Sequence, residues 1–379
     1  MAKKRKIRVN LRKNRYKPPR DRSWTRDYQT GALADEEAAA AAERVRAKGA
    51  LSRKRTIITD ETAAEGVQPA EMPAVDLAAC LPGRVLRVQG LHSLVAADDG
   101  RQFRCVVRRL LRNLVIDERN IVVTGDRVWF RPAGADEGVI ERVEPRHGLL
   151  TRASRAKEHV IVANVDQLVI VASLAEPALK PHLIDRYLVS AEQGGIRPIV
   201  CLNKADLVDP ADFQPLAGLY AQLGLPVLFT SATTGQGIDR LRALLRDRQT
   251  VFSGQSGVGK SSLLNAVQPG LDLKVRTVSE ATEKGRHTTT TAELIKLEFG
   301  GWVVDTPGIR QFALWDIIPE ELEGFFPEFR PYVPHCYFSG CTHRHENGCA
   351  IKEAVRRHRI AVQRYESYLG LFAGKLLED

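Results

Sequence analysis

The sequence predicts a multidomain α/β protein, and three patterns in its 379 residues indicate this fold class. Five short β-type runs lie within residues 81–143, and apolar runs alternate with helical stretches over residues 166–266. Three cysteines cluster with histidines near the C-terminal end. A chain of this length is expected to form about two to four domains.

Residues 1–79 are predicted to form a basic and then Ala- and Glu-rich arm, largely flexible and with one helix at most. The first 27 residues hold twelve Lys and Arg against two Asp, and the whole chain carries a formal net charge of +10. Such an arm releases counterions when it lies along nucleic-acid phosphates. The alternative is a solvated tail that only aids solubility.

The chain is expected to be soluble and cytoplasmic. It has no run of eighteen or more apolar residues, and its basic N-terminus lacks the apolar core of a secretory signal. Its six cysteines are therefore not expected to form disulfides. No membrane partner is predicted.

Residues 80–147 are predicted to form an OB-type β-barrel. Gly, Asp and Pro separate five runs, which read GRVLRVQG, HSLVAADD, QFRCVVRR, GDRVWFRP and GVIERVEP. Five short strands within this length suit a small closed barrel.

Residues 148–310 are predicted to form a parallel α/β sheet. The expected strands are DQLVIVASL, RPIVCLNKAD, PVLFTSA and QTVFSGQSG. The expected helices lie around LIDRYLVSAEQGG, PLAGLYAQLG and IDRLRALLRD. Because the strands are apolar without alternation, helices should cover both faces of the sheet.

A phosphate-binding loop follows the last of these strands. The sequence GQSGVGKS matches GxxxxGKS between a strand and a helix, the context that this motif requires. Lys260 would neutralise the β- and γ-phosphates and assist catalysis, and the Ser261 hydroxyl would bind Mg²⁺. The candidate residues are Gly254, Gln255, Ser256, Gly257, Val258, Gly259, Lys260, Ser261 and Ser262. A tight turn without a ligand is the alternative, and the strand-to-helix context disfavours it.

A guanine-reading loop is predicted about fifty residues earlier in the chain. Asn203, Lys204, Ala205 and Asp206 follow an apolar strand, at the sheet edge where open α/β folds bind ligands. The Asp206 carboxylate can accept hydrogen bonds from N1–H and the exocyclic amine of guanine, an arrangement that adenine does not offer. Ser231 and Ala232 follow the next strand, where a backbone N–H could meet the guanine carbonyl.

Two further segments are expected to sense the γ-phosphate. Asp305 begins the sequence DTPG after a strand, so that it would approach Mg²⁺ while the Gly308 N–H would meet the γ-phosphate. The polar loop GRHTTTT lies where a first switch loop belongs, and either Thr289 or Thr290 would complete the Mg²⁺ shell. The alternative is that these threonine hydroxyls are solvated in a loop and bind no metal.

His287 is the candidate catalytic residue for water activation. Ile309 occupies the position after DTPG, where many GTPases carry a Gln that orients the attacking water. An aliphatic side chain cannot orient water, whereas an imidazole can align it and accept its proton near neutral pH. A structural or RNA-facing histidine is the alternative. Hydrolysis is expected to be slow until a partner orders the loop.

The order of these motifs indicates a circular permutation, because the base-reading loop precedes the phosphate loop. The same sheet can still form, since chain termini commonly lie close together at a domain surface. The fold class is therefore an N-terminal OB-type β-barrel, a circularly permuted P-loop GTPase domain and a C-terminal zinc-binding domain.

The C-terminal domain, residues 311–379, is predicted to bind one structural zinc ion. Cys336, Cys341, His343 and Cys349 supply three thiolates and one imidazole, a set suited to tetrahedral Zn²⁺ with no open position. His343 is preferred to other histidines by spacing alone. One helix is expected over residues 351–377, and Arg356, Arg357, Arg359 and Arg364 on it form either an RNA-facing or a solvated basic face.

The chain resembles the ribosome small-subunit-dependent GTPase A (RsgA) family of bacterial circularly permuted GTPases. An OB-like segment, then the nucleotide motifs in the order above, then the C-x4-C-x-H-x5-C cluster carry the resemblance over residues 80–379. The resemblance implies a GTPase that binds GTP or GDP, Mg²⁺ and one Zn²⁺. It further implies binding to the 30S ribosomal subunit and its 16S rRNA during late maturation, 30S-stimulated turnover, and His287 as catalytic. The chain is expected to act as a monomer.

Two other functions remain open at this point. A nucleotide-insensitive rRNA-binding scaffold with a decayed GTPase centre is one, although Lys260, Ser261, Asp206 and Asp305 are intact. A P-loop kinase for a small molecule is the other, and the NKAD sequence disfavours it.

Overall fold

The computed structural model describes residues 4–10, 54–60, 75–108, 111, 121–154, 157–271, 273, 292–305 and 319–374. The chain forms two compact units, one of residues 1–76 with 108–121 and one of residues 77–107 with 122–379. In the first unit, β1 (Lys4–Asn10) pairs antiparallel with β2 (Lys54–Asp60). The expected arm did not include these strands, and its Ala- and Glu-rich stretch lies outside the described residues.

The second unit begins with a closed five-stranded barrel. Its elements are η2 (Leu77–Ala79), β3 (Leu81–Gln89), β4 (His92–Ala97), β5 (Gln102–Val107), β6 (Arg127–Pro132) and β7 (Glu137–Val143). The strand order is β3-β4-β5-β7-β6, and β6 pairs with β3 to close the barrel. Phe103 and Phe130 meet in its interior with ring centroids 5.0 Å apart. The predicted small closed barrel is confirmed.

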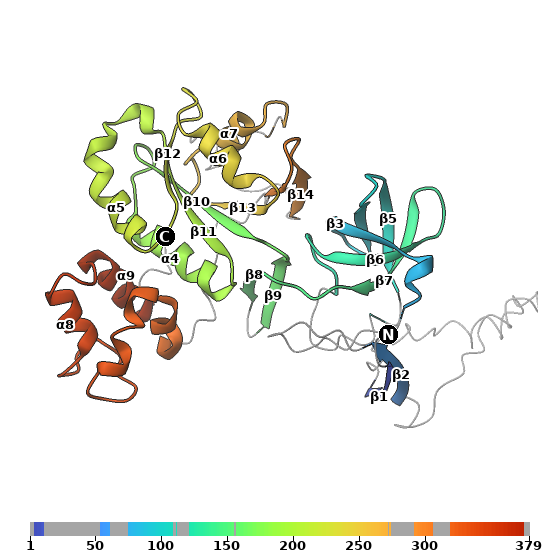
Figure 1. The fold of residues 1–379 in the computed structure, drawn as a ribbon, viewed down its shortest axis with the longest axis horizontal. Coiled ribbons are helices and arrows are strands. Elements are labelled where there is room, and N and C mark those ends of the chain that lie inside the picture. The colour runs from blue at the N-terminus through green and yellow to red at the C-terminus, as the bar shows by residue number, and fades with distance from the viewer. Residues whose placement is uncertain are drawn as a thin grey trace, which may run out of the picture. The chain divides into compact units, whose positions relative to one another are not determined.

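A mainly parallel sheet follows the barrel (Figure 1). Its strands are β10 (Gln167–Ser173), β11 (Arg197–Asn203), β12 (Val227–Thr230), β13 (Gln249–Ser253), β14 (Glu293–Lys296) and β15 (Trp302–Asp305). Its helices are α4 (Pro181–Gln193), η3 (Ala205–Leu207), η4 (Pro210–Phe213), α5 (Gln214–Gln222), α6 (Ile238–Leu245) and α7 (Lys260–Val267). A hairpin of β8 (Leu150–Ser154) and β9 (Lys157–Val162) connects the barrel to this sheet.

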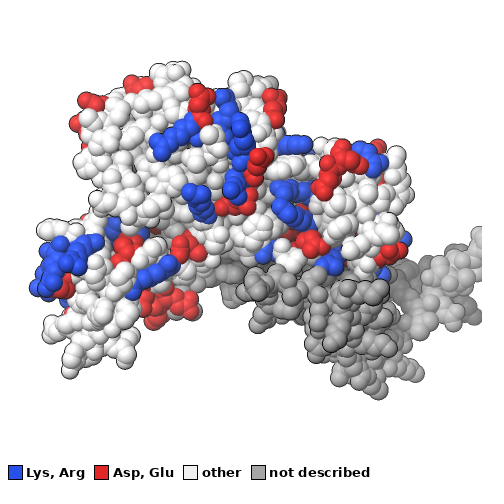
Figure 2. Space-filling model, viewed as in Figure 1, with Lys and Arg blue, Asp and Glu red and all other residues white. Residues whose placement is uncertain are grey.

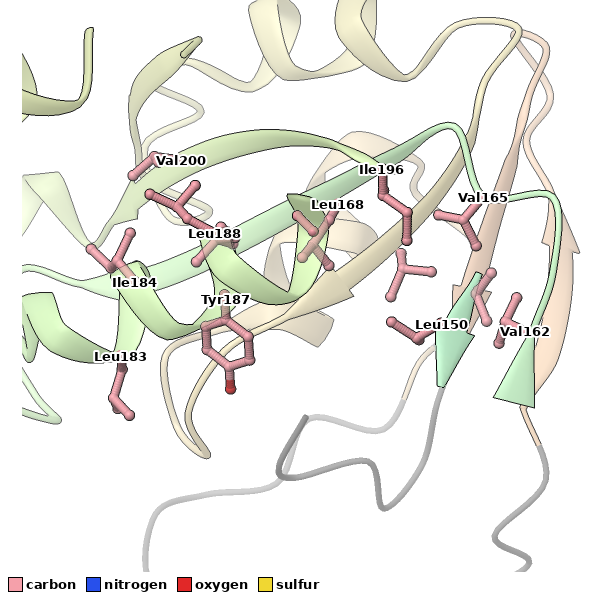
Figure 3. Packing of buried hydrophobic residues seen from close by; sticks show 14 of the residues in the cluster. Leu150, Val162, Val165, Leu168, Leu183, Ile184, Tyr187, Leu188, Ile196 and Val200 are labelled. Carbon is pink, nitrogen blue, oxygen red and sulfur yellow. The ribbon is translucent and has the colours of Figure 1, made fainter. Parts of the chain in front are cut away.

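Helices cover both faces of the sheet, as the apolar strands predict. One buried cluster joins strand residues such as Leu168 and Val200 to Tyr187 of α4 and Tyr220 of α5, and Figure 3 shows part of it. A second cluster joins the alternate strand residues, including Val169, to α6 and α7. Because side chains alternate along a strand, an uninterrupted apolar strand supplies both clusters.

The strand order agrees with the predicted circular permutation, because β11, which precedes the predicted base-reading loop, comes earlier in the chain than β13, which precedes the glycine-rich loop. The order is β12-β11-β10-β13-β15-β14, with β14 the antiparallel strand at one edge. From β10 the chain runs outward through β11 to β12, and from β13 it continues to β14 and β15 on the other side. The strand order therefore reverses between β10 and β13, the place where ligands of such sheets bind.

The barrel is joined to the edge strand of this sheet. Arg87 of β3 pairs with Glu293 of β14 in the ladder, and their side chains form an ion pair at 3.6 Å. The Thr124 hydroxyl donates to the Ala292 carbonyl at 2.9 Å. One hydrogen-bonded sheet therefore runs through both parts.

The C-terminal module contains η6 (Pro319–Phe325), η7 (Pro327–Phe329), η8 (Val333–His335), α8 (Ala350–Arg356) and α9 (Val362–Phe372). The expectation of one helix over residues 351–377 was wrong. The N–H groups of Arg359 and Ile360 both bond to the Ala354 carbonyl, and His358 has a φ of 55°. This left-handed residue ends α8 in the manner of a C-terminal helix cap.

Arg364 does not belong to an exposed basic face, which corrects the expectation for that residue. It is 1% exposed, and its guanidinium donates to Glu328 Oε1 at 2.7 Å and to Asp185 Oδ1 of α4 at 2.8 Å. The Ser367 hydroxyl donates to the other Asp185 oxygen at 2.5 Å. This buried ion pair attaches α9 to the sheet domain, whereas Arg356, Arg357 and Arg359 are exposed.

Replacing Arg364 by Ala is expected to lower the free energy of unfolding by about 3–5 kcal/mol, because Asp185 would remain buried without its cation. Arg357→Ala is the matched control: this side chain is 65% exposed and pairs with Glu353, so its loss should cost less than about 1 kcal/mol. Urea denaturation of both variants measures the difference. Equal small losses would contradict the importance of the buried pair.

Candidate nucleotide and metal sites

The glycine-rich loop between β13 and α7 adopts backbone conformations that require glycine. Gly254 and Gly259 have φ angles of 144° and 95°. A Cβ at Gly254 would lie 2.1 Å from the Val171 carbonyl oxygen of β10. The loop can therefore pass close to the neighbouring strand and turn its N–H groups toward an anion.

The first residues of α7 follow this loop directly. The Lys260 ammonium donates to the Gly254 and Gln255 carbonyls, each at 2.8 Å, so it lies across the loop. Ser261 and Ser262 are partly exposed in the first helical turn, where backbone N–H groups have no partner within the helix. The loop and this helix end together offer amines, amides and hydroxyls to phosphate and Mg²⁺.

Asn203, at the end of β11, connects the predicted base-reading loop with the phosphate loop. Its Nδ2 donates to the Val258 carbonyl at 2.8 Å, and its Oδ1 accepts from the Thr230 hydroxyl at 3.1 Å. Asn203 is 2% exposed. The structure thus joins three segments that are far apart in sequence. Sequence reasoning missed Thr230, although it directly precedes Ser231.

The other residues predicted to read the base lie at the carboxyl ends of β11 and β12, which are neighbours in the sheet. Lys204 has a φ of 64° and precedes η3, in which Ala205 is buried and Asp206 is exposed. Ser231 is buried, and its hydroxyl accepts from the N–H groups of Thr233 and Thr234 at 3.2 and 3.1 Å. Ala232 follows, partly exposed. One sheet edge therefore carries both predicted loops.

Replacing Gly259 by Ala is expected to weaken guanine-nucleotide binding by roughly 10-fold or more. The new Cβ would lie 2.5 Å from Asn203 Nδ2 and would displace the residue that joins the two loops. Gly270→Ala is the matched control, because Gly270 has the same φ of 95° with nothing within 4 Å. Titration with a fluorescent GDP analogue measures both. Equal affinity losses in the two variants would mean that backbone strain, and not the contact with Asn203, causes the weaker nucleotide binding.

Several predicted residues lie outside the part of the chain that the structure describes. These residues are His287, Thr289, Thr290 and Gly308. Asp305 is the last residue of β15, the strand beside β13. The roles of these four residues and of Asp305 stay predictions.

The predicted zinc ligands come together in the C-terminal module. One ligand atom from each of Cys336, Cys341, His343 and Cys349 lies within 4.8 Å of all the others. His343 directs Nδ1 to the Cys336 and Cys349 sulfurs at 3.5 and 3.4 Å. Burial raises the pKa of the Cys341 thiol to about 12, so a thiolate there requires a cation beside it. Three thiols and one imidazole around one point fit tetrahedral Zn²⁺.

Glu323 of η6 is a partner of this cluster that sequence reasoning missed. Its Oε2 lies 2.5 Å from His343 Nε2, the ring nitrogen that faces away from the cysteines. A carboxylate in this position fixes the histidine tautomer and orients the ring toward a metal. Because Glu323 is separated from His343 by 20 residues, no ligand-spacing pattern includes it.

Among the residues that the structure describes, no helix has the length and apolar character needed to cross a membrane.

A family model described as RsgA GTPase matches residues 143–315. The curated small ribosomal subunit biogenesis GTPase RsgA of Chlorobaculum tepidum is 43% identical over 304 residues, covering 77% of this chain and 97% of the relative. The protein of the same name from Thermotoga petrophila is 44% identical over 292 residues, covering 75% and 94%.

Two solved structures are also similar. YjeQ from Thermotoga maritima matches with a TM-score of 0.66 and 38% identity, over 79% of this chain and all 100% of that one. YloQ, described as a circularly permuted GTPase, matches with a TM-score of 0.62 and 30% identity, over 78% and 95% of the two chains.

Proposed function

The chain belongs to the RsgA GTPase family and is a GTP hydrolase, and from this premise we propose that it acts on the 30S ribosomal subunit during late maturation. The 30S subunit would stimulate its turnover, and hydrolysis to GDP and phosphate would promote its release. Relatives named as small ribosomal subunit biogenesis GTPases support this function. We further propose that it works in the cytoplasm as a monomer.

The structural observation that supports nucleotide-dependent action is the hydrogen bond from Asn203 to the Val258 carbonyl. It fixes the base-reading loop against the phosphate loop, so that one nucleotide can contact both. The alternative is a nucleotide-insensitive scaffold with a decayed GTPase centre. A Lys260→Ala variant that still supported normal maturation would favour the scaffold.

Each site residue has a proposed role. Asp206 selects guanine, with Ser231 and Ala232 facing its carbonyl, and Lys260 neutralises the β- and γ-phosphates. Ser261, Asp305 and either Thr289 or Thr290 would hold Mg²⁺, which supplies positive charge to the phosphate oxygens when bound. Gly308 senses the γ-phosphate. His287 orients the attacking water and accepts its proton.

The three domains and the arm keep their predicted boundaries as a proposal: arm 1–79, OB-fold 80–147, GTPase 148–310 and zinc domain 311–379. The 16S rRNA is the proposed partner of the arm, barrel and zinc domain. Figure 2 shows groups of Lys and Arg on one face of the described surface, one over α6 and one at the α8 end of the C-terminal module. Such groups suit contact with phosphates.

The test is GTP and ATP turnover by the purified protein, alone and with 30S subunits, beside His287→Ala. We expect strong stimulation that is specific to GTP and absent in the variant. His358→Ala, an exposed histidine after α8, is the matched control and should keep the stimulation. Turnover indifferent to 30S subunits would mean that the partner is wrong, and equal turnover of ATP would favour a kinase.

A further inference from the structure

Two aromatic side chains project from the zinc-binding module into solvent. Tyr337 is 80% exposed and Phe338 is 49% exposed, and among the described residues no other Phe, Tyr or Trp side chain is exposed. Their ring centroids lie 4.9 Å apart with an interplanar angle of 84°. The other described rings of this module are buried, as Phe326 and Phe329 are, or partly buried, as Tyr332 and Phe372 are. An adjacent exposed pair therefore indicates a contact surface and not a part of the core.

The loop that carries the pair is constrained at both ends. It lies between the predicted zinc ligands Cys336 and Cys341, and the Tyr337 N–H donates to the Gly348 carbonyl at 3.1 Å. A Cβ at Gly348 would lie 3.0 Å from the Tyr337 Cβ, so the two segments pack closely. Rings held on a fixed loop lose little conformational entropy when they bind a partner.

The segment of chain that carries the pair is basic or neutral in sequence. No acidic residue occurs from residue 331 to residue 345, whereas His335, Arg344 and His345 are exposed. The nearest carboxylate along the chain, Glu346, accepts hydrogen bonds from the N–H groups of Thr342 and Arg344 at 2.8 and 2.9 Å. It is therefore engaged with its own loop.

We propose that Tyr337 and Phe338 form a stacking site for unpaired bases of the small-subunit RNA. Aromatic faces bind bases by stacking, and nearby cations and an absence of carboxylates favour the phosphates between those bases. An apolar groove on a protein partner would use the rings but would gain nothing from the positive charge of Arg344 in the same segment. This inference rests on the proposed function, to which it adds the place and the mode of contact.

The test measures binding of zinc-loaded, full-length protein to 30S subunits. Tyr337→Ala and Phe338→Ala should each weaken binding by roughly 10-fold, and the double variant by roughly 100-fold. Tyr337→Phe with Phe338→Tyr should bind as the unmodified protein does, because both rings remain. Val362→Ala, in the same module and 48% exposed, is the matched control and should have no effect. Zinc content of every variant confirms that the module is folded.

Three outcomes would overturn the proposal. Alanine variants that bind normally would exclude a contact at this loop. Full affinity in Tyr337→Leu with Phe338→Leu would indicate a protein groove, because leucine keeps apolar area but cannot stack. If the unmodified protein fails to bind 30S subunits, the proposed function fails and this inference fails with it. Ultraviolet cross-links from the loop to 16S rRNA bases, and not to ribosomal proteins, are expected in the unmodified protein.

Discussion

Replacing Asp206 by Asn is expected to transfer the preference of this GTPase from guanine to xanthine nucleotides. The carboxylate is proposed to accept two hydrogen bonds from guanine, and each bond to a charged group contributes about 1.5–3 kcal/mol. An amide presents a donor to one of these guanine donors, whereas xanthine offers a carbonyl there. Affinity for GDP should fall by at least about 100-fold while affinity for XDP rises.

Competition titrations with GDP and XDP measure this exchange. Asp212→Asn is the matched control, since Asp212 is exposed in η4, a few residues beyond the base-reading loop. It should leave the preference for guanine intact. Unchanged GDP affinity in Asp206→Asn would show that another residue selects the base.

Removal of zinc is expected to unfold the C-terminal module while the nucleotide-binding sheet stays folded. Structural zinc contributes about 10–16 kcal/mol to small zinc domains. Residues 319–374, the described part of the module, form five short helical segments around one small core that includes Cys341 and Cys349 themselves. After chelation, or in the Cys349→Ser variant, the amide hydrogens of residues 319–374 should therefore lose their protection from exchange. Those of β10–β13 should keep it.

Two variants serve as references for the zinc prediction. Cys80→Ser changes a buried cysteine outside the cluster and should retain one zinc per chain. Glu323→Gln should retain zinc but bind it about 10–100-fold more weakly, because the histidine loses its carboxylate partner. Unchanged protection in chelated protein would contradict a structural role of the metal.

The sequence was sufficient for the parts of the fold that depend on neighbouring residues. Short β-type runs separated by Gly, Asp and Pro predicted the barrel strands, and uninterrupted apolar runs predicted a sheet covered on both faces. The phosphate loop could be located because Gly254 and Gly259 are needed for its backbone, whatever surrounds it. The spacing of the cysteines likewise restricts them to one small loop region, where a single metal can reach all of them.

Helix boundaries and charged side chains were harder to predict. Residues 351–377 read as one helix because propensity is nearly continuous there, and only the left-handed His358 and the hydrogen bonds to Ala354 end α8. Composition likewise contained no sign that Lys4–Asn10 would pair with Lys54–Asp60.

What the sequence by itself determined is the set of residues that the chemistry would use: a glycine-rich phosphate-loop motif, a predicted guanine-reading loop and a cysteine and histidine cluster suited to zinc. Only the tertiary structure decided which polar groups would be buried against one another. Asp185 and Arg364 are 179 residues apart, and neither shows in sequence that the other will neutralise it. The hydrogen bonds between Asn203 and Val258 and between Glu323 and His343 could likewise not be predicted from the sequence. Short-range patterns record backbone preference and covalent spacing, whereas a buried charge or amide becomes tolerable only when folding brings its partner within hydrogen-bond distance.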